Sequence, residues 1–135
     1  MKGYLLDTSI CIFLFRNKYD IGKRLNELDV NECYISEVTV AELKYGIENS
    51  KQREIESQKL DRFLKRINIV PFCESIDLYA KEKARLRKEG FLIDDFDLLI
   101  GCAALSRDLI MVTDNEKHFA RIQHLRIENW VNREG

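Results

Sequence analysis

Short apolar runs alternate along the chain with longer segments in which apolar residues recur every three or four positions. The first run, Tyr4 to Leu6, ends at Asp7 and Thr8, and the segment that follows it is apolar on most sides. A short run of this kind is typical of a strand whose two faces are both buried in a parallel sheet. The same reasoning predicts further strands at 33–35, 69–70, 109–112 and 125–127, and helices at 9–15, 21–28, 37–49, 60–67, 76–89 and 98–105, with a short polar helix that ends near residue 119.

Strands that alternate with helices predict an α/β fold, a three-layer α/β/α domain with a central parallel sheet of four to five strands. The pattern does not give the order of the strands. With 135 residues, one proline and six glycines, the chain is predicted to form a single domain over residues 1–135. No apolar stretch approaches the roughly 20 residues of a membrane span, and no signal peptide is visible, so we expect a cytoplasmic protein without membrane contact.

Charge and cysteine content narrow the functional classes. The net charge of −1 argues against a general electrostatic attraction to nucleic acid, so any such contact needs a local basic patch or metal ions. The four cysteines are far apart and form no CxxC pair, which argues against a zinc or redox site. We expect all four to be small buried hydrophobic residues.

Polar or acidic residues follow three of the predicted strands. These strand ends lie on one edge of a parallel sheet, where α/β proteins bind ligands. Two predicted helices also place acids near their starts. The candidates are Asp7-Thr8, Ser36 and Thr113-Asp114-Asn115 at the strand ends, with Glu42, Asp94, Asp95 and Asp97 on the helices.

Carboxylates gathered at one point repel one another, and a divalent cation relieves that repulsion. Ligands that are all oxygen favour Mg²⁺ or Mn²⁺ over zinc, and such ions serve phosphate chemistry. Glu42 and Asp97 each have a glycine four residues later, Gly46 and Gly101. This spacing predicts room beside each acid for an ion and a phosphate.

A purely structural interpretation accounts for each acid as well. Asp7 is a favoured helix N-cap, and Thr39 with Glu42 matches a capping box unless Ser36 is the cap. Asp94 and Asp95 are interpreted as complements of a helix dipole, whereas function is favoured for Asp97. Asp114 and Asn115 suit a turn equally well.

Five stretches in order resemble the PIN-domain ribonucleases, and in particular the VapC toxins of VapBC toxin–antitoxin pairs. They extend over nearly the whole chain: 4–12 (YLLDTSICI), 35–46 (ISEVTVAELKYG), 93–101 (IDDFDLLIG), 112–119 (VTDNEKHF) and 125–130 (LRIENW). The rival haloacid-dehalogenase-type phosphatases need a second acid two residues after Asp7, where this chain has Ser9.

The resemblance implies a Mg²⁺-dependent endoribonuclease, with Mn²⁺ able to substitute, that hydrolyses phosphodiester bonds in single-stranded or loop RNA such as tRNA. It assigns the metal-binding and catalytic acids to Asp7, Glu42 and Asp97, with Thr8 as a ligand or orienting hydroxyl. The family's variable fourth acid aligns with Asn115, so Asp114 is the expected substitute from one position away. A homodimer and a cognate antitoxin whose tail enters the site are also implied. The alternative is a degenerate PIN domain that binds RNA or protein without catalysis.

Overall fold

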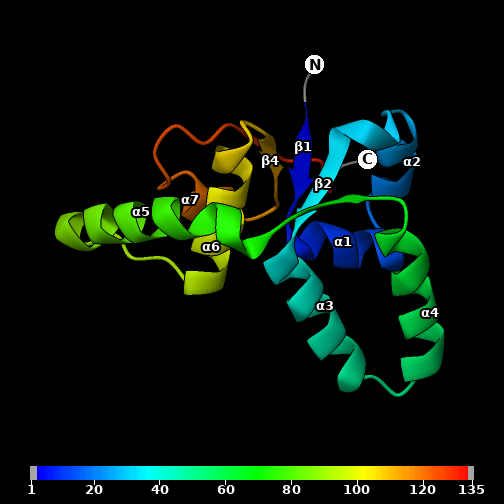
Figure 1. Ribbon diagram of the computed structural model, residues 1–135. Coiled ribbons are helices and arrows are strands. Elements are labelled where there is room, and N and C mark those ends of the chain that lie inside the picture. The colour runs from blue at the N-terminus through cyan, green and yellow to red at the C-terminus, as the bar shows by residue number, and fades with distance from the viewer. Residues whose placement is uncertain (1–2, 134–135) are drawn as a thin grey trace.

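Five parallel strands form the centre of the molecule in the computed structural model, which describes residues 3–133 (Figure 1). Their order is β3-β2-β1-β4-β5. The strands are β1 (Tyr4–Leu6), β2 (Cys33–Ser36), β3 (Asn68–Val70), β4 (Ile110–Val112) and β5 (Ile127–Glu128). The predicted three-layer α/β/α class with a parallel sheet of four to five strands is therefore confirmed, and the sheet has five.

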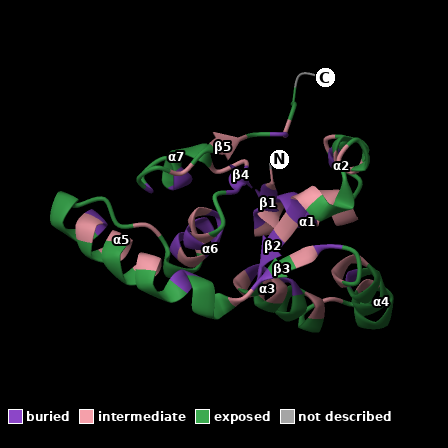
Figure 2. Ribbon diagram, turned by 45° about the horizontal axis from the view of Figure 1, so that its top comes forward, coloured by how far each residue is buried: buried purple, intermediate pink, exposed green. Residues whose placement is uncertain are grey.

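Helices cover both faces of the sheet because successive strand residues point to opposite faces. Leu6 contributes to the core beneath one group of helices, and its neighbour Leu5 to the core beneath the other; both are fully buried. Figure 2 shows the buried residues concentrated on the strands and on α6, with exposed residues on the outer helices. The first group is α1 (Thr8–Phe15), α2 (Ile21–Asn26), α3 (Glu37–Glu48) and α4 (Arg53–Leu64), and the second is α5 (Ile76–Glu89), α6 (Asp95–Ser106) and α7 (Glu116–Phe119).

Short 3₁₀ turns and helix caps complete the connections. The turns are η1 (Val30–Glu32) and η2 (Phe72–Ser75). Gly90 ends α5 in the left-handed conformation (φ 76°), as its position predicts. Ser36 caps α3, since its Oγ accepts a hydrogen bond from the Val38 amide at 3.0 Å.

Several boundaries differ from those predicted, including the start of α4 and both ends of β5. Helix α4 begins at Arg53, because residues 53–57, which are mostly polar and all exposed except the half-buried Glu56, form a first turn and a half ahead of the buried Leu60. The last strand is Ile127–Glu128 and not 125–127, because β5 is fixed by the amides of β4. The Met111 amide donates to the Arg126 carbonyl, and the Thr113 amide donates to the Glu128 carbonyl.

Three of the four cysteines are buried, and one is exposed. Cys11, Cys33 and Cys102 are buried as predicted. The prediction for Cys73 is wrong: it lies on the η2 turn that follows Pro71, and this turn leaves it exposed. Within residues 3–133, no helix combines the length and apolar character needed to cross a membrane.

Candidate active site

Asp7 lies where β1 ends, at the carboxyl edge of the central strand, and only 5% of its surface is exposed. Its carboxylate accepts three hydrogen bonds, from the Thr8 amide at 2.7 Å, the Ser9 hydroxyl at 3.2 Å and the Thr113 hydroxyl at 2.8 Å. Burial raises the pKa of Asp7, and the three donors oppose that rise. Asp7 is the N-cap of α1, as the structural interpretation predicts, and its second oxygen faces the neighbouring strand end.

Thr8 connects the first acid to the second. Its Oγ1 donates to Glu42 Oε1 at 2.7 Å and lies 3.0 Å from Thr39 Oγ1. Because Ser36 caps α3, Thr39 and Glu42 lie inside the helix and form no capping box. Desolvation raises the pKa of Glu42, the Thr8 hydroxyl lowers it, and the charges of Asp7 and Asp94 raise it further.

Asp97 occupies the first turn of α6 and is half-buried. Burial raises the pKa of its carboxyl, and the charges of Asp7, Asp94 and Glu42 add to that, so the pKa reaches about 6. Asp7 and Glu42 must therefore lie close to Asp97, although they come from different elements. The structure thus brings the predicted acids Asp7, Glu42 and Asp97 together, with Thr8 between the first two.

The other acids of the α6 region have different partners. Asp94 is the N-cap of α6, where its Oδ2 accepts from the Phe96 amide at 3.1 Å. Asp95 accepts from Lys83 Nζ at 2.8 Å and from the Tyr79 hydroxyl at 2.9 Å. Asp95 therefore links α6 to α5. Asp94 caps the helix and also lies near the acids, since its charge raises the pKa of both Glu42 and Asp97.

Asp114 binds a residue near the end of the chain, Arg133. Both of its carboxylate oxygens accept from the Arg133 guanidinium, at 2.9 and 2.6 Å, and Asn129 donates to one of them at 3.3 Å. The Arg133 hydrogen bonds lower the pKa of Asp114. The neighbouring Asn115 donates from its side chain toward His118 Nδ1. Asp114 as a fourth metal ligand stays a prediction, and it would require the carboxylate to leave Arg133.

The two glycines near the acids, Gly46 and Gly101, differ in the space around them. A Cβ on Gly46 would meet no atom within 4 Å, so the space predicted beside Glu42 is present. A Cβ on Gly101 would collide with Ile122 Cδ1 and touch Phe119 and Leu125. Gly101 therefore serves the packing of α6 against α7 and the loop after it, and the expectation that it leaves room for a phosphate is wrong.

The donor set fits a hard divalent cation, because three carboxylates and a hydroxyl offer only oxygen. Burial raises the pKa of Asp7, Glu42 and Asp97, and the charge of Asp7 raises the pKa of both Glu42 and Asp97 further, an unfavourable interaction that a cation would remove. In residues 3–133 no three His, Cys, Asp or Glu side chains stand arranged to hold a metal ion as they lie.

Ser9 and Arg133 were not among the candidate residues, and Thr113 was a candidate only as part of a strand end. Thr113 is fully buried and holds Asp7, and Ser9 donates to the same oxygen. The signal for Thr113 was its position at the end of β4, but only the pairing of β4 with β1 reveals the contact. Arg133, the partner of Asp114, carries no signal in the sequence pattern.

Known proteins resemble this chain over most of its length. A family model described as "PIN domain" matches residues 4–125. The chain is 37% identical over 132 residues to ribonuclease VapC2 of Rickettsia felis, with 94% of this chain and 97% of that protein covered. It is 36% identical over 132 residues to the tRNA(fMet)-specific endonuclease VapC of Shigella flexneri, with 96% and 99% covered.

Two solved structures are similar in fold. A chain of DNA-bound VapBC from Salmonella typhimurium superposes with a TM-score of 0.89 at 32% identity, covering 96% of this chain and 99% of that one. A chain of VapBC2 from Rickettsia felis, bound to a DNA fragment from its promoter, gives a TM-score of 0.86 at 35% identity, with 94% and 98% covered.

Proposed function

We propose, since the chain belongs to the PIN-domain family and to its VapC ribonucleases, that it is a metal-dependent endoribonuclease and the toxin of a type II toxin–antitoxin pair. The bond it hydrolyses is a phosphodiester in single-stranded or loop RNA. The observation that supports this most directly is the convergence of Asp7, Glu42 and Asp97 at the carboxyl edge of the sheet.

Mg²⁺, or Mn²⁺ in its place, is the proposed cofactor, and Asp7, Glu42 and Asp97 are the residues that would hold it. When bound, such an ion would lower the pKa of water and offset the charge of the phosphate. The chain's own residues orient the acids. Thr113 and Ser9 fix one oxygen of Asp7, and Thr8 holds Glu42 by the bond from its Oγ1 to Oε1.

The proposed partners follow from the relatives. A loop of tRNA is the first substrate to test, because one relative is named a tRNA(fMet)-specific endonuclease. A cognate antitoxin is inferred because the similar solved structures are VapBC complexes, and we infer a homodimer by the same analogy. A substrate of this class places the activity in the cytoplasm. We further infer that residues 1–135 act as one domain, because all five strands join one sheet.

The test combines metal binding with RNA cleavage. Calorimetry with Mn²⁺ should detect binding by the wild type and little or none by Asp7→Asn, because the variant loses a charged ligand. Cleavage of tRNA in Mg²⁺ should be abolished in Asp97→Ala while its circular dichroism spectrum matches the wild type.

Each result bears on one part of the proposal. An Asp7→Asn variant that binds Mn²⁺ as tightly as the wild type would leave Asp7 with a capping role alone. An active Asp97→Ala variant would remove Asp97 from the mechanism. A wild type that binds RNA and metal but cuts nothing would favour the alternative, a binding module.

A further inference from the structure

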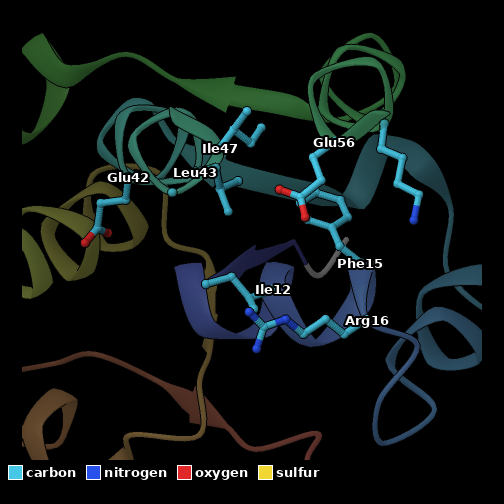
Figure 3. Close-up of a pocket in the computed structure, with 9 residues that line it drawn as sticks. Ile12, Phe15, Arg16, Glu42, Leu43, Ile47 and Glu56 are labelled. Atoms are coloured by element: carbon cyan, nitrogen blue, oxygen red, sulfur yellow. The ribbon is translucent and has the colours of Figure 1, made fainter. Parts of the chain in front are cut away.

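A cavity of about 180 Å³ lies between α1, α3 and α4, and Glu42, one of the three acids, lines it. Figure 3 shows Ile12 and Phe15 of α1 facing Leu43 and Ile47 of α3, with Glu42 at one end of the space. Glu42 therefore belongs both to the acid cluster and to the wall of this cavity. The remaining lining residues are Arg16, Gly46, Glu56 and Lys59.

We propose that this cavity is a base-binding subsite, which receives one unstacked nucleobase of the RNA next to the phosphate that is cut. The inference rests on the proposed function, because that function brings a phosphodiester to Glu42. It adds a recognition element that lies beside the acids and takes no part in their chemistry.

The size and the walls of the cavity suit one base. An apolar cavity of roughly 150 Å³ admits a benzene ring, so about 180 Å³ admits a single ring system and excludes a complete nucleoside. Single-stranded RNA is recognised through bases that leave the stack and lie against apolar and aromatic side chains. Phe15 and the aliphatic residues of α1 and α3 supply such a surface.

The charges at the rim suit the RNA backbone. Arg16 and Lys59 are exposed cations at the rim, and in the described part of the chain neither forms an ion pair within 4 Å. They are placed to contact the phosphates that flank the bound base. The apolar walls, the two cations and the continuity with Glu42 together favour RNA over a protein segment as the occupant.

Glu56 gives the subsite a preference among bases. It is the one carboxylate besides Glu42 among the described residues that line the cavity. A carboxylate accepts from the exocyclic amine of cytosine, whereas uracil presents an oxygen at that position. A single ring with an amine is therefore the favoured ligand, and cytosine should bind better than uracil.

The test is to fill the cavity with a larger side chain at position 46. Gly46→Leu places a side chain in open space on a helix and improves helix propensity, so the fold should persist. Affinity for a short fluorescent oligocytidylate, measured by anisotropy in EDTA to prevent cleavage, should fall by about 5- to 100-fold. Ala41→Leu, on an exposed position of the same helix outside the cavity, should change it less than twofold.

The variant should raise KM for RNA more than it lowers kcat, because it alters none of the three acids. In Glu56→Gln the preference of the wild type for oligocytidylate over oligouridylate should shrink, because a neutral amide presents a donor as well as an acceptor.

The outcomes separate this proposal from the proposed function. A wild type that cuts RNA, with Gly46→Leu binding oligocytidylate at unchanged affinity, overturns the subsite and leaves the nuclease intact. Loss of binding to the co-expressed antitoxin with unchanged RNA affinity would assign the cavity to a protein segment and overturn the RNA assignment. A wild type that neither binds Mn²⁺ nor cuts RNA would overturn both.

Discussion

At the scale of single residues, structural and functional interpretations of an acid prove compatible. Asp7 caps α1 through one oxygen and receives the hydroxyls of Ser9 and Thr113 on the other. A buried carboxylate that stays ionised needs such donors, because burial alone raises its pKa. The same three bonds also hold the carboxylate in one orientation, which a metal ligand requires.

Thr113→Val tests how much this orientation depends on one hydroxyl. Thr113 is fully buried, donates to Asp7 at 2.8 Å and accepts from the Asn115 amide at 2.9 Å. Valine has nearly the same shape, so the loss reflects the bonds, and the free energy of unfolding should fall by about 1–3 kcal/mol. Urea unfolding measures it. Ser9→Ala, which removes a longer bond at a more exposed position, is the control and should cost less; equal losses would contradict this account.

At the scale of elements, helix α6 shows how one helix serves three tasks through its periodicity. Asp94 caps it, and Asp97, three residues on, faces the acids. Gly101, four residues further, meets α7 and the loop beyond. Residues three or four apart share a face only approximately, and that divergence is why the sequence misassigned the space at Gly101.

We therefore expect the same substitution to have opposite effects on stability at Gly46 and at Gly101. Gly46→Ala should raise the free energy of unfolding by about 0.5–1 kcal/mol, because it stiffens an open helical position. Gly101→Ala should lower it by about 1 kcal/mol or more, because the buried Ile122 must move. Thermal unfolding of the pair measures both. An increase for Gly101→Ala would mean that the packing beside α6 yields easily.

The sequence was most informative where the signal is local. Apolar runs located β1, β2 and β4, and the caps at Ser36 and Gly90 follow from residue type. The contact between Thr113 and Asp7 depends on β4 pairing with β1, which no local pattern encodes. The partner of Asp114 likewise lies 19 residues away at the end of the chain.

At the scale of the whole molecule, the strand order makes the site possible. Placing β1 between β2 and β4 brings the residues after all three strands to one edge, and α3 and α6 add their acids there. The fold thereby holds three carboxyls in unfavourable surroundings, because burial raises the pKa of Asp7, Glu42 and Asp97, and nearby acids raise those of Glu42 and Asp97 further. The stability of the metal-free protein must then depend on pH.

The raised pKa values determine whether stability rises or falls with pH. A carboxyl whose pKa rises on folding favours the folded state when protonated, so its cost is relieved as pH falls from about 7 through about 6, the pKa of Asp97. Below about pH 4.5 the acids whose pKa is lowered, such as the exposed Glu74 and the half-buried Asp114, lose their ion pairs and stability falls again.

In EDTA, the melting temperature should therefore rise between about pH 7 and pH 5 and decline below it. Saturating Mg²⁺ should raise the melting temperature at pH 7 and remove the rise toward pH 5, because ligands must be ionised to bind. Asp97→Asn, which carries no charge at any pH, should be more stable than the wild type at pH 7 without metal, by about 1–2 kcal/mol after allowance for solvent screening. Scanning fluorimetry across pH measures all three curves. A metal-free melting temperature that falls steadily from pH 7 to pH 5 would show that ionisation of these carboxyls does not destabilise the fold, and the argument for a shared cation would lose its physical basis.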